Sequence, residues 1–226
     1  SETAYVGPGE NPPSLRWFTP TTEVDLCGHA TLAAAHVLWE RDYVPVDEPI
    51  RFETASGLLT CTREEDWISM EFPVDAPEKT TAPEGLLSAL GVTDEEVPYM
   101  GRTQFDYFLE LADEQRLGQL TPDYRRLEEI DTRGVVVTTT HSGNRYDFQS
   151  RFFAPAAGVN EDPATGSAHC ALGPYWRERL GKKTLDGYQC SAPGAHIRVE
   201  VLEDRVDLMG QAVTVFQGQI APQESS

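Results

Sequence analysis

Alternating apolar and polar residues predict short strands along most of this chain. Such period-two segments, bounded by glycine, proline or charged turns, are typical of strands with one buried face. The pattern predicts strands at 4–6, 15–18, 50–61, 67–72, 105–111, 135–140, 146–153, 197–202, 206–208 and 212–216. We expect the last three to form an antiparallel meander.

Two longer segments have the composition of helices instead. Residues 28–41 and 165–180 are rich in helix-forming residues and are apolar on almost every side. A helix without a polar face lies inside a core, so both helices are expected to be buried. Pro174 should kink the second one, because proline lacks the N–H of the helical hydrogen bond, and Gly181 should end it. A short helix is expected at 85–90.

An internal repeat relates the two halves of the chain. At a constant offset of 135 residues, Arg16, Phe18, Pro20 and Val24 recur as Arg151, Phe153, Pro155 and Val159. Each copy leads into one of the two long helices. The repeat predicts an α+β fold of two pseudo-symmetric lobes, 1–95 and 96–226, each a curled antiparallel sheet around a central helix. The active-site cleft would lie between them.

The repeat also predicts that the chain is incomplete at its start. Arg151 follows roughly 50 residues of strand and helix pattern, whereas Arg16 follows only 15 residues. The first residue is Ser1 rather than methionine. We therefore expect a first hairpin and helix, roughly 35–45 residues, to be missing before Ser1.

The charge of the chain argues against several classes of partner. Acidic residues outnumber basic ones by 37 to 18, which gives a net charge of −19. This field repels nucleic acid and anionic membranes. The four cysteines form no CxxC pair and the five histidines have no zinc-site spacing, so no metal is expected. Without a signal-like start, these thiols indicate a reduced, cytoplasmic protein.

The two long helices begin with glycine, which leaves their first N–H groups accessible to a ligand. Gly28 and Gly166 stand at these starts, where the positive end of the helix dipole attracts a carboxylate or an enolate. Ordinary capping, with Thr165 as N-cap and Asp162 beside it, is the alternative. If both ends face one cleft, they would hold an acid substrate from two sides.

Two side chains could carry acid/base chemistry. His29 lies in the first turn of its helix and is either a general acid/base or a hydrogen-bonded core histidine. Glu2 is either a functional carboxylate or a solvated one near the end of the chain. No dinucleotide-binding, P-loop or nucleophile-elbow motif occurs. The residues alone leave these alternatives open.

Four motifs together resemble the phenazine-biosynthesis PhzF-like isomerase family. They are SETAYV at 1–6, LRWFTP at 15–20, EVDLCGHATLA at 23–33 and NEDPATGSAH at 160–169. The resemblance covers most of the chain and implies the diaminopimelate epimerase-like fold, which has two lobes with one central helix each. A departure lies at 189–195, where many relatives carry a Gln-Gly-Ser and Arg-Gly-Gly pattern.

The resemblance implies a function and a set of site residues. Glu2 would be the general acid/base of an isomerase, and His29 and Asp162 would assist it. The substrate would be a small carboxylate-bearing metabolite in which a proton shifts position, and neither a cofactor nor a metal is implied. Family members often form homodimers. The residues expected to bind substrate are Gly28, Thr165, Gly166 and Ser167.

Two other functions stay open. Epimerisation or racemisation on the same fold would use Cys27, which stands where related two-thiol enzymes place one catalytic cysteine. The second lobe, however, offers Asp162 and Pro163 at the corresponding place, and one thiol cannot serve as two bases. The other alternative is a non-catalytic metabolite-binding protein, which the departure at 189–195 favours.

Overall fold

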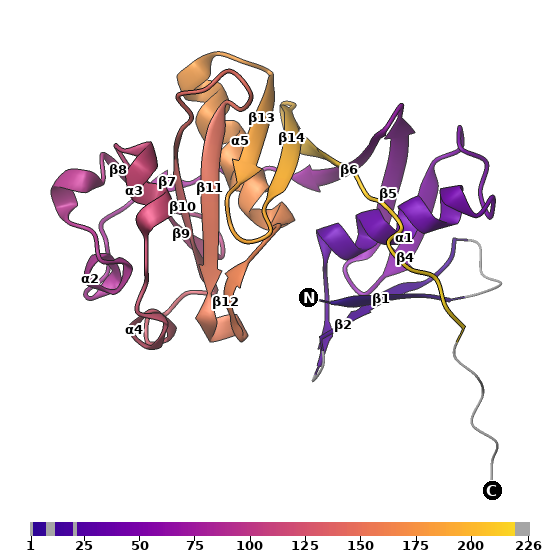
Figure 1. Ribbon diagram of the computed structural model, residues 1–226, viewed down its shortest axis with the longest axis horizontal. Coiled ribbons are helices and arrows are strands. Elements are labelled where there is room, and N and C mark those ends of the chain that lie inside the picture. Colours follow the sequence, from indigo (N-terminus) through magenta and orange to yellow (C-terminus); the bar gives the residue numbers. More distant parts are fainter. Residues whose placement is uncertain (1, 8–11, 20–21, 220–226) are drawn as a thin grey trace, which may run out of the picture.

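Most strands join one large sheet that extends along the length of the molecule (Figure 1). The computed structural model describes residues 2–7, 12–19 and 22–219, so that Ser1 and Pro20 of the motifs lie outside the described residues. This sheet has 12 strands, and β12 (Val159–Asp162) pairs with β11 off its main path. The main path is β4 (Ile50–Thr54), β5 (Gly57–Glu64), β6 (Trp67–Pro73), β15 (Arg205–Gly210), β14 (Ala195–Val201), β13 (Thr184–Gln189), β11 (Phe148–Ala154), β10 (Gly134–Thr140), β9 (Asp106–Glu110), β8 (Tyr99–Arg102) and β7 (Glu78–Lys79).

A small second sheet and two long helices complete the frame. The small sheet has the order β1 (Thr3–Val6), β2 (Leu15–Phe18) and β3 (Glu23–Val24). Helix α1 lies over β1 on the right of Figure 1, and α5 lies among the strands on the left. The helices are α1 (Gly28–Glu40), α2 (Leu86–Leu90), α3 (Glu114–Gln119), α4 (Tyr124–Glu128) and α5 (Gly166–Leu180), with 3-10 turns η1 (Asp94–Glu96) and η2 (Pro155–Ala157).

The two copies of the repeat have the same local structure. β2 and β11 each carry the repeated arginine, pair with a short antiparallel strand, and precede one of the two long helices. Arg16 donates two hydrogen bonds of 2.7 Å to Glu23 of β3, and Arg151 donates two of 2.7 Å to Glu161 of β12. Each ion pair joins a strand, β2 or β11, to the short strand that leads into the long helix, α1 or α5.

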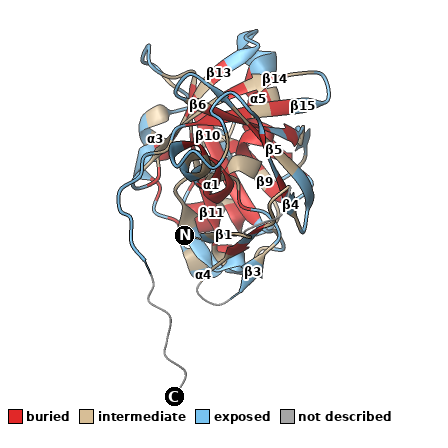
Figure 2. Cartoon of the chain, turned by 90° about the vertical axis from the view of Figure 1, so that its right-hand side faces the viewer, coloured by how far each residue is buried: buried red, intermediate tan, exposed pale blue. Residues whose placement is uncertain are grey.

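Buried apolar residues form three clusters. The buried parts of the chain are red in Figure 2. The first joins α1 and β1 to β6 with β14 and β15, and it includes Trp17 and Trp39. The third centres on α5, where Trp176 stacks on Phe148 with ring centroids 6.0 Å apart. The second contains Leu86 and Leu90 of α2 together with β9 and β10. The predicted division of the chain into two lobes at residue 95 stays a prediction. Because α2 packs with β9 and β10, we propose that the boundary between the lobes lies ahead of α2.

The helices agree with the sequence pattern except on one face of α1 and in the last turn of α5. Ala33, Val37 and Glu40 of α1 are exposed, so the expectation of burial on every side was wrong for this helix. Helix α5 is mostly buried along 168–176 but exposed at 177–180, and it ends at Gly181, as predicted. It continues through Pro174 because the carbonyl of Cys170, which the missing N–H would have bonded, accepts a hydrogen bond from the Asp75 N–H at 3.2 Å.

The strands differ from expectation in several places, and the sequence pattern did not predict β3, β7, β8, β12 or β13. Residues 50–61 form two strands, β4 and β5, because Ala55 and Ser56 make a turn. Residues 212–216 form no strand, and Val215 is 92% exposed. Two strand pairs are parallel, β9 with β10 and β11 with β13, because helical crossovers connect them. Within the described part of the chain, no helix is long and apolar enough to cross a membrane.

Helix α5 packs closely against the sheet at Gly173. A Cβ added there would lie 2.6 Å from Cγ1 of Val199 and 3.1 Å from Cγ2 of Val201. We expect Gly173→Ala to lower the free energy of unfolding by about 1–3 kcal/mol through overpacking. Gly118→Ala is the matched control, because Gly118 is also helical but a Cβ there meets nothing within 4 Å. The control should gain up to ~1 kcal/mol from helix propensity. Urea titration of both variants measures these changes, and equal stabilisation of both would contradict the packing argument.

Candidate active site

The first turns of α1 and α5 meet near the middle of the molecule. A Cβ placed on Gly28 would lie 3.9 Å from the Cα of Gly166, so the absence of side chains lets the two helix starts come together. Cys27 and Thr165 occupy the two N-cap positions, and neither side chain makes a capping hydrogen bond. The expected N-cap bond from Thr165 is therefore absent. Two positive helix ends without side-chain caps converge, which favours a bound anion.

Three donor atoms gather beside these helix starts, from Glu2 just before β1, from the N-cap Cys27 and from His29 of α1. Oε2 of Glu2 lies 3.0 Å from Nε2 of His29. Sγ of Cys27 lies 3.6 Å from the same Glu2 oxygen and 3.5 Å from His29 Nε2. The side chains of Glu2 and His29 are 19% and 34% exposed, so a small molecule can reach them while most of the surrounding water is excluded.

A hydrogen bond to the second half of the chain orients His29. Its Nδ1 lies 3.3 Å from the carbonyl oxygen of Ala164, just ahead of α5. A carbonyl oxygen only accepts, so Nδ1 carries a hydrogen and donates it. Nε2 is then the atom that gains or loses a proton, and it faces Glu2. The pair can pass a proton between a carboxylate and an imidazole.

The loop that precedes α5 is held by a buried glutamine. Oε1 of Gln189 accepts the N–H of Thr165 at 2.9 Å, and Nε2 of Gln189 donates to Oγ1 of Thr165 at 3.1 Å. Oγ1 of Thr165 in turn donates to Asp162 at 2.6 Å, and the Thr165 carbonyl accepts from Nδ1 of His169 at 2.8 Å. All polar atoms of Thr165 thus have protein partners. Thr165 therefore stabilises the conformation of the loop and the position of the Asp162 side chain.

Ser167 has a different partner at the start of α5. Its hydroxyl oxygen accepts a hydrogen bond of 3.0 Å from Arg133. Arg133 also pairs with Asp106, which is buried. This arrangement fixes the Ser167 side chain beside the helix start.

Burial changes the acidity of the thiol in the group. Cys27 is 6% exposed. Desolvation, opposed by the nearby Ala30 N–H and reinforced by the Glu2 carboxylate, raises the pKa of the Cys27 thiol to about 12. A thiol with this pKa is protonated at neutral pH and is a poor base or nucleophile.

Slow alkylation should reveal this protonated state. At pH 8, in buffer containing EDTA, we expect iodoacetamide to modify Cys27 at least about 10³-fold more slowly than the same cysteine in urea-unfolded protein. Peptide mass spectrometry distinguishes Cys27 from the other cysteines. Modification of Cys27 at the unfolded rate would show that the thiolate is available and would reopen a thiol mechanism.

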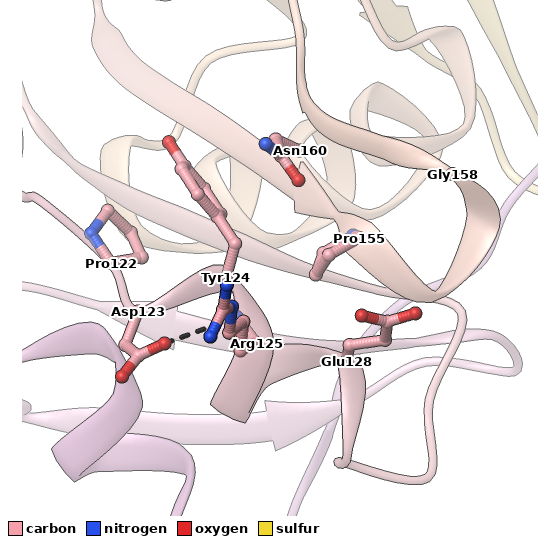
Figure 3. A pocket seen from close by; sticks show the side chains of 8 residues that line it. All are labelled: Pro122, Asp123, Tyr124, Arg125, Glu128, Pro155, Gly158 and Asn160. Carbon is pink, nitrogen blue, oxygen red and sulfur yellow. Dashed lines mark hydrogen bonds between the residues drawn. The ribbon is translucent and has the colours of Figure 1, made fainter.

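A surface pocket lies away from this group. It has a volume of about 460 Å³, and Tyr124 of α4 faces Asn160 of β12 across it (Figure 3). Asp123 and Arg125 contact each other on its α4 side. None of its lining residues belongs to the Glu2–His29 group, so the pocket is a separate feature of the surface.

The structure brings together most of the residues that the sequence indicated. Glu2 and His29 are in contact, and His29 reaches the loop that carries Asp162. The sequence did not indicate Arg133 or the role of Gln189, since neither lies in a helix-start motif. Gln189 opens the segment in which the chain departs from many relatives, and that was the one available signal.

Known proteins resemble this chain along nearly its whole length. Residues 1–218 match the family of phenazine biosynthesis-like proteins, PhzC-PhzF. An uncharacterized isomerase from Halalkalibacterium halodurans is 50% identical over 221 residues, which cover 97% of this chain and 82% of the relative. The chain belongs to the PhzF family. It is an isomerase, as its close relatives are named.

Solved structures place this PhzF-family protein in a wider fold group. A PhzF-family phenazine biosynthesis protein from Enterococcus faecalis has a TM-score of 0.86 and 40% identity, and the match covers 93% of this chain and 79% of that one. A predicted epimerase from Pseudomonas aeruginosa has a TM-score of 0.65 at 19% identity, covering 96% and 84%, and shares the fold alone. The predicted diaminopimelate epimerase-like fold of this PhzF-family chain is confirmed.

Proposed function

We propose that this protein moves a proton within a small carboxylate-bearing metabolite, with Glu2 as the general acid/base. The contact that carries the proposal is Oε2 of Glu2 at 3.0 Å from Nε2 of His29, beside the two converging helix starts. Glu2 takes a proton from carbon, and the electron pair passes into the adjacent unsaturated group. The protonated Glu2, whose carboxyl hydrogen exchanges with solvent while the intermediate is bound, then returns a proton to another carbon, so no electrons are gained or lost overall.

The helix starts supply the charge stabilisation that this reaction needs. N–H groups at Gly28, Gly166 and Ser167 would bind the carboxylate and the developing enolate. An aligned donor of this kind contributes about 3–4 kcal/mol to the transition state. His29 would relay the proton through Nε2. The Asp162 carboxylate would give the loop that faces His29 a negative charge. The scheme uses side chains and backbone groups only and needs no cofactor.

Epimerisation through a thiol is the weaker alternative. It requires a reactive thiolate at Cys27, whereas burial keeps that thiol protonated. The family resemblance further suggests homodimers, and the four free cysteines fit a reducing, cytoplasmic setting.

Hydrogen exchange with solvent tests the proposed function. The protein would be incubated in D2O with small unsaturated and amino-acid carboxylates, and the products analysed by mass spectrometry and NMR. We expect deuterium at one new carbon together with a shifted double bond. Exchange at a single carbon with inversion would indicate an epimerase. Tight binding of an acid without exchange would indicate a binding protein, and either result would contradict the proposal.

A further inference from the structure

The Glu2, Cys27 and His29 side chains form a triangle with the dimensions of a metal site. The three donor atoms, Oε2, Sγ and Nε2, are 3.0, 3.5 and 3.6 Å apart. In tetrahedral zinc sites, with bonds of about 2.0–2.1 Å to nitrogen and oxygen and 2.3 Å to sulfur, neighbouring donor atoms lie about 3.3–3.6 Å apart. Sγ of Cys27 lies 3.8 Å from Nδ1 as well as 3.5 Å from Nε2 of His29, so it stands beside the imidazole ring, and the Cys27 side chain must rotate for one ion to bind all three atoms.

The orientation of the imidazole also matches. Histidines that bind metal with one ring nitrogen usually donate the other N–H to a carbonyl or carboxylate. In this protein, Nδ1 of His29 donates to the carbonyl oxygen of Ala164 at 3.3 Å, which leaves Nε2 as the ring nitrogen that can bind an ion. This contact comes from outside the triangle, and it independently fits a metal ligand.

The charges around the triangle balance a divalent cation. The Glu2 carboxylate and a Cys27 thiolate supply two negative charges, and the Asp162 carboxylate acts electrostatically on Cys27 from across the site. These charges offset the positive end of α1. A bound zinc ion displaces the thiol proton, which passes to solvent. The partial exposure of Glu2 and His29 leaves the fourth position to water or to a ligand carboxylate.

We propose that Glu2, Cys27 and His29 bind Zn²⁺ and that the bound ion switches the active site off. The ion occupies the lone pairs of Glu2 Oε2 and His29 Nε2, which are the atoms that would move the substrate proton. The metal site itself depends only on the geometry, whereas the inhibition rests on the proposed function. The soft thiolate together with imidazole favours zinc or cobalt over magnesium or calcium.

Cobalt absorption tests the metal site without any need for activity. We expect Co²⁺ to give a thiolate charge-transfer band with the wild-type protein and with Cys170→Ser. Cys27→Ser should give no such band. Its affinity for Co²⁺ should fall by at least about 100-fold, because mutation of a residue that only hydrogen-bonds to a metal ligand already lowers metal affinity 10–100-fold. Cys170 is the matched control because it is also 6% exposed and lies in the first turns of α5.

A band of equal strength in Cys27→Ser, or no band in the wild type, would overturn the metal site. Cys27→Ala and Glu2→Gln provide second variants, and circular dichroism establishes that each one is folded. Loss of Co²⁺ affinity is expected in both.

Zinc inhibition of deuterium exchange tests the second part. Each protein is compared with its own metal-free rate, and EDTA should restore the wild-type rate. Cys27→Ser should need at least about 100-fold more Zn²⁺ for half-inhibition. Cobalt binding without any exchange activity would remove the proposed function and keep the metal site. Exchange that is insensitive to Zn²⁺ would keep the function and overturn the switch.

Discussion

Glu2→Gln should lower the rate of deuterium exchange by about 10²–10⁴-fold, the usual contribution of a positioned general acid/base. Glutamine keeps the size of the side chain and its position beside His29, but its amide cannot take a proton from carbon. The fold should be unaffected, because Glu2 lies at the edge of the small sheet and its contacts are with Cys27 and His29. Mass spectrometry of the products in D2O measures the rate.

Two further variants sharpen this result. Glu2→Asp keeps the carboxylate but shortens its reach to His29, so its rate should fall between those of the wild type and Glu2→Gln. Glu64→Gln is the control, because it removes an exposed carboxylate from β5, outside the site. It should exchange at the wild-type rate. Wild-type exchange by Glu2→Gln would remove Glu2 from the mechanism.

Acid should destabilise the protein through His169, which is completely buried behind the Asp162 loop. Its Nδ1 donates to the carbonyl of Thr165, and its Nε2 has no hydrogen-bond partner among the described residues. Burial disfavours the charged imidazolium and lowers the pKa of His169 from 6.5 to about 4. In the unfolded chain the same side chain takes up a proton near pH 6.5. Stability is therefore lost as the pH falls from 6.5 towards 4, by about 3 kcal/mol in total for this group.

Urea titrations of the wild type and two variants isolate this contribution. His169→Gln and His169→Leu do not titrate, so the difference in free energy of unfolding between pH 6.5 and 4 should shrink by about 3 kcal/mol in both. The comparison uses slopes with pH, so any constant loss of stability in the variants cancels. An unchanged pH dependence in both variants would show that His169 is not held neutral.

The sequence predicted those features that depend on local residue pattern. Glycine at 28, 91 and 181 marks helix ends where the structure has them. The residues around Glu2 and His29 were recognisable by their resemblance to a family, and the structure brings them together. Local pattern could not show that His29 is fastened to Ala164, because that bond joins residues 135 positions apart.

The features that the sequence did not predict likewise depend on contacts between residues distant in the chain. The alternation at 212–216 has the composition of a strand, yet a strand also needs a neighbouring backbone, and in the described part of the chain this segment pairs with none. Parallel pairing of β11 with β13 depends on where α5 returns the chain. Gln189 acts on Thr165 from a strand that is distant in sequence, so its type and position carried no sign of that role.

The pairing of β6 with β15 has a consequence for synthesis on the ribosome. This pairing joins residues 68–73 to 205–210, and the core around α1 includes Val199, Val201 and Leu208 from the last strands. The apolar surfaces of the first strands therefore stay uncovered while the intervening segment is translated, on the order of ten seconds. A nascent chain at this stage is a natural client for chaperones, and the active site is incomplete until the loop with Ala164 and the strand with Gln189 have been translated.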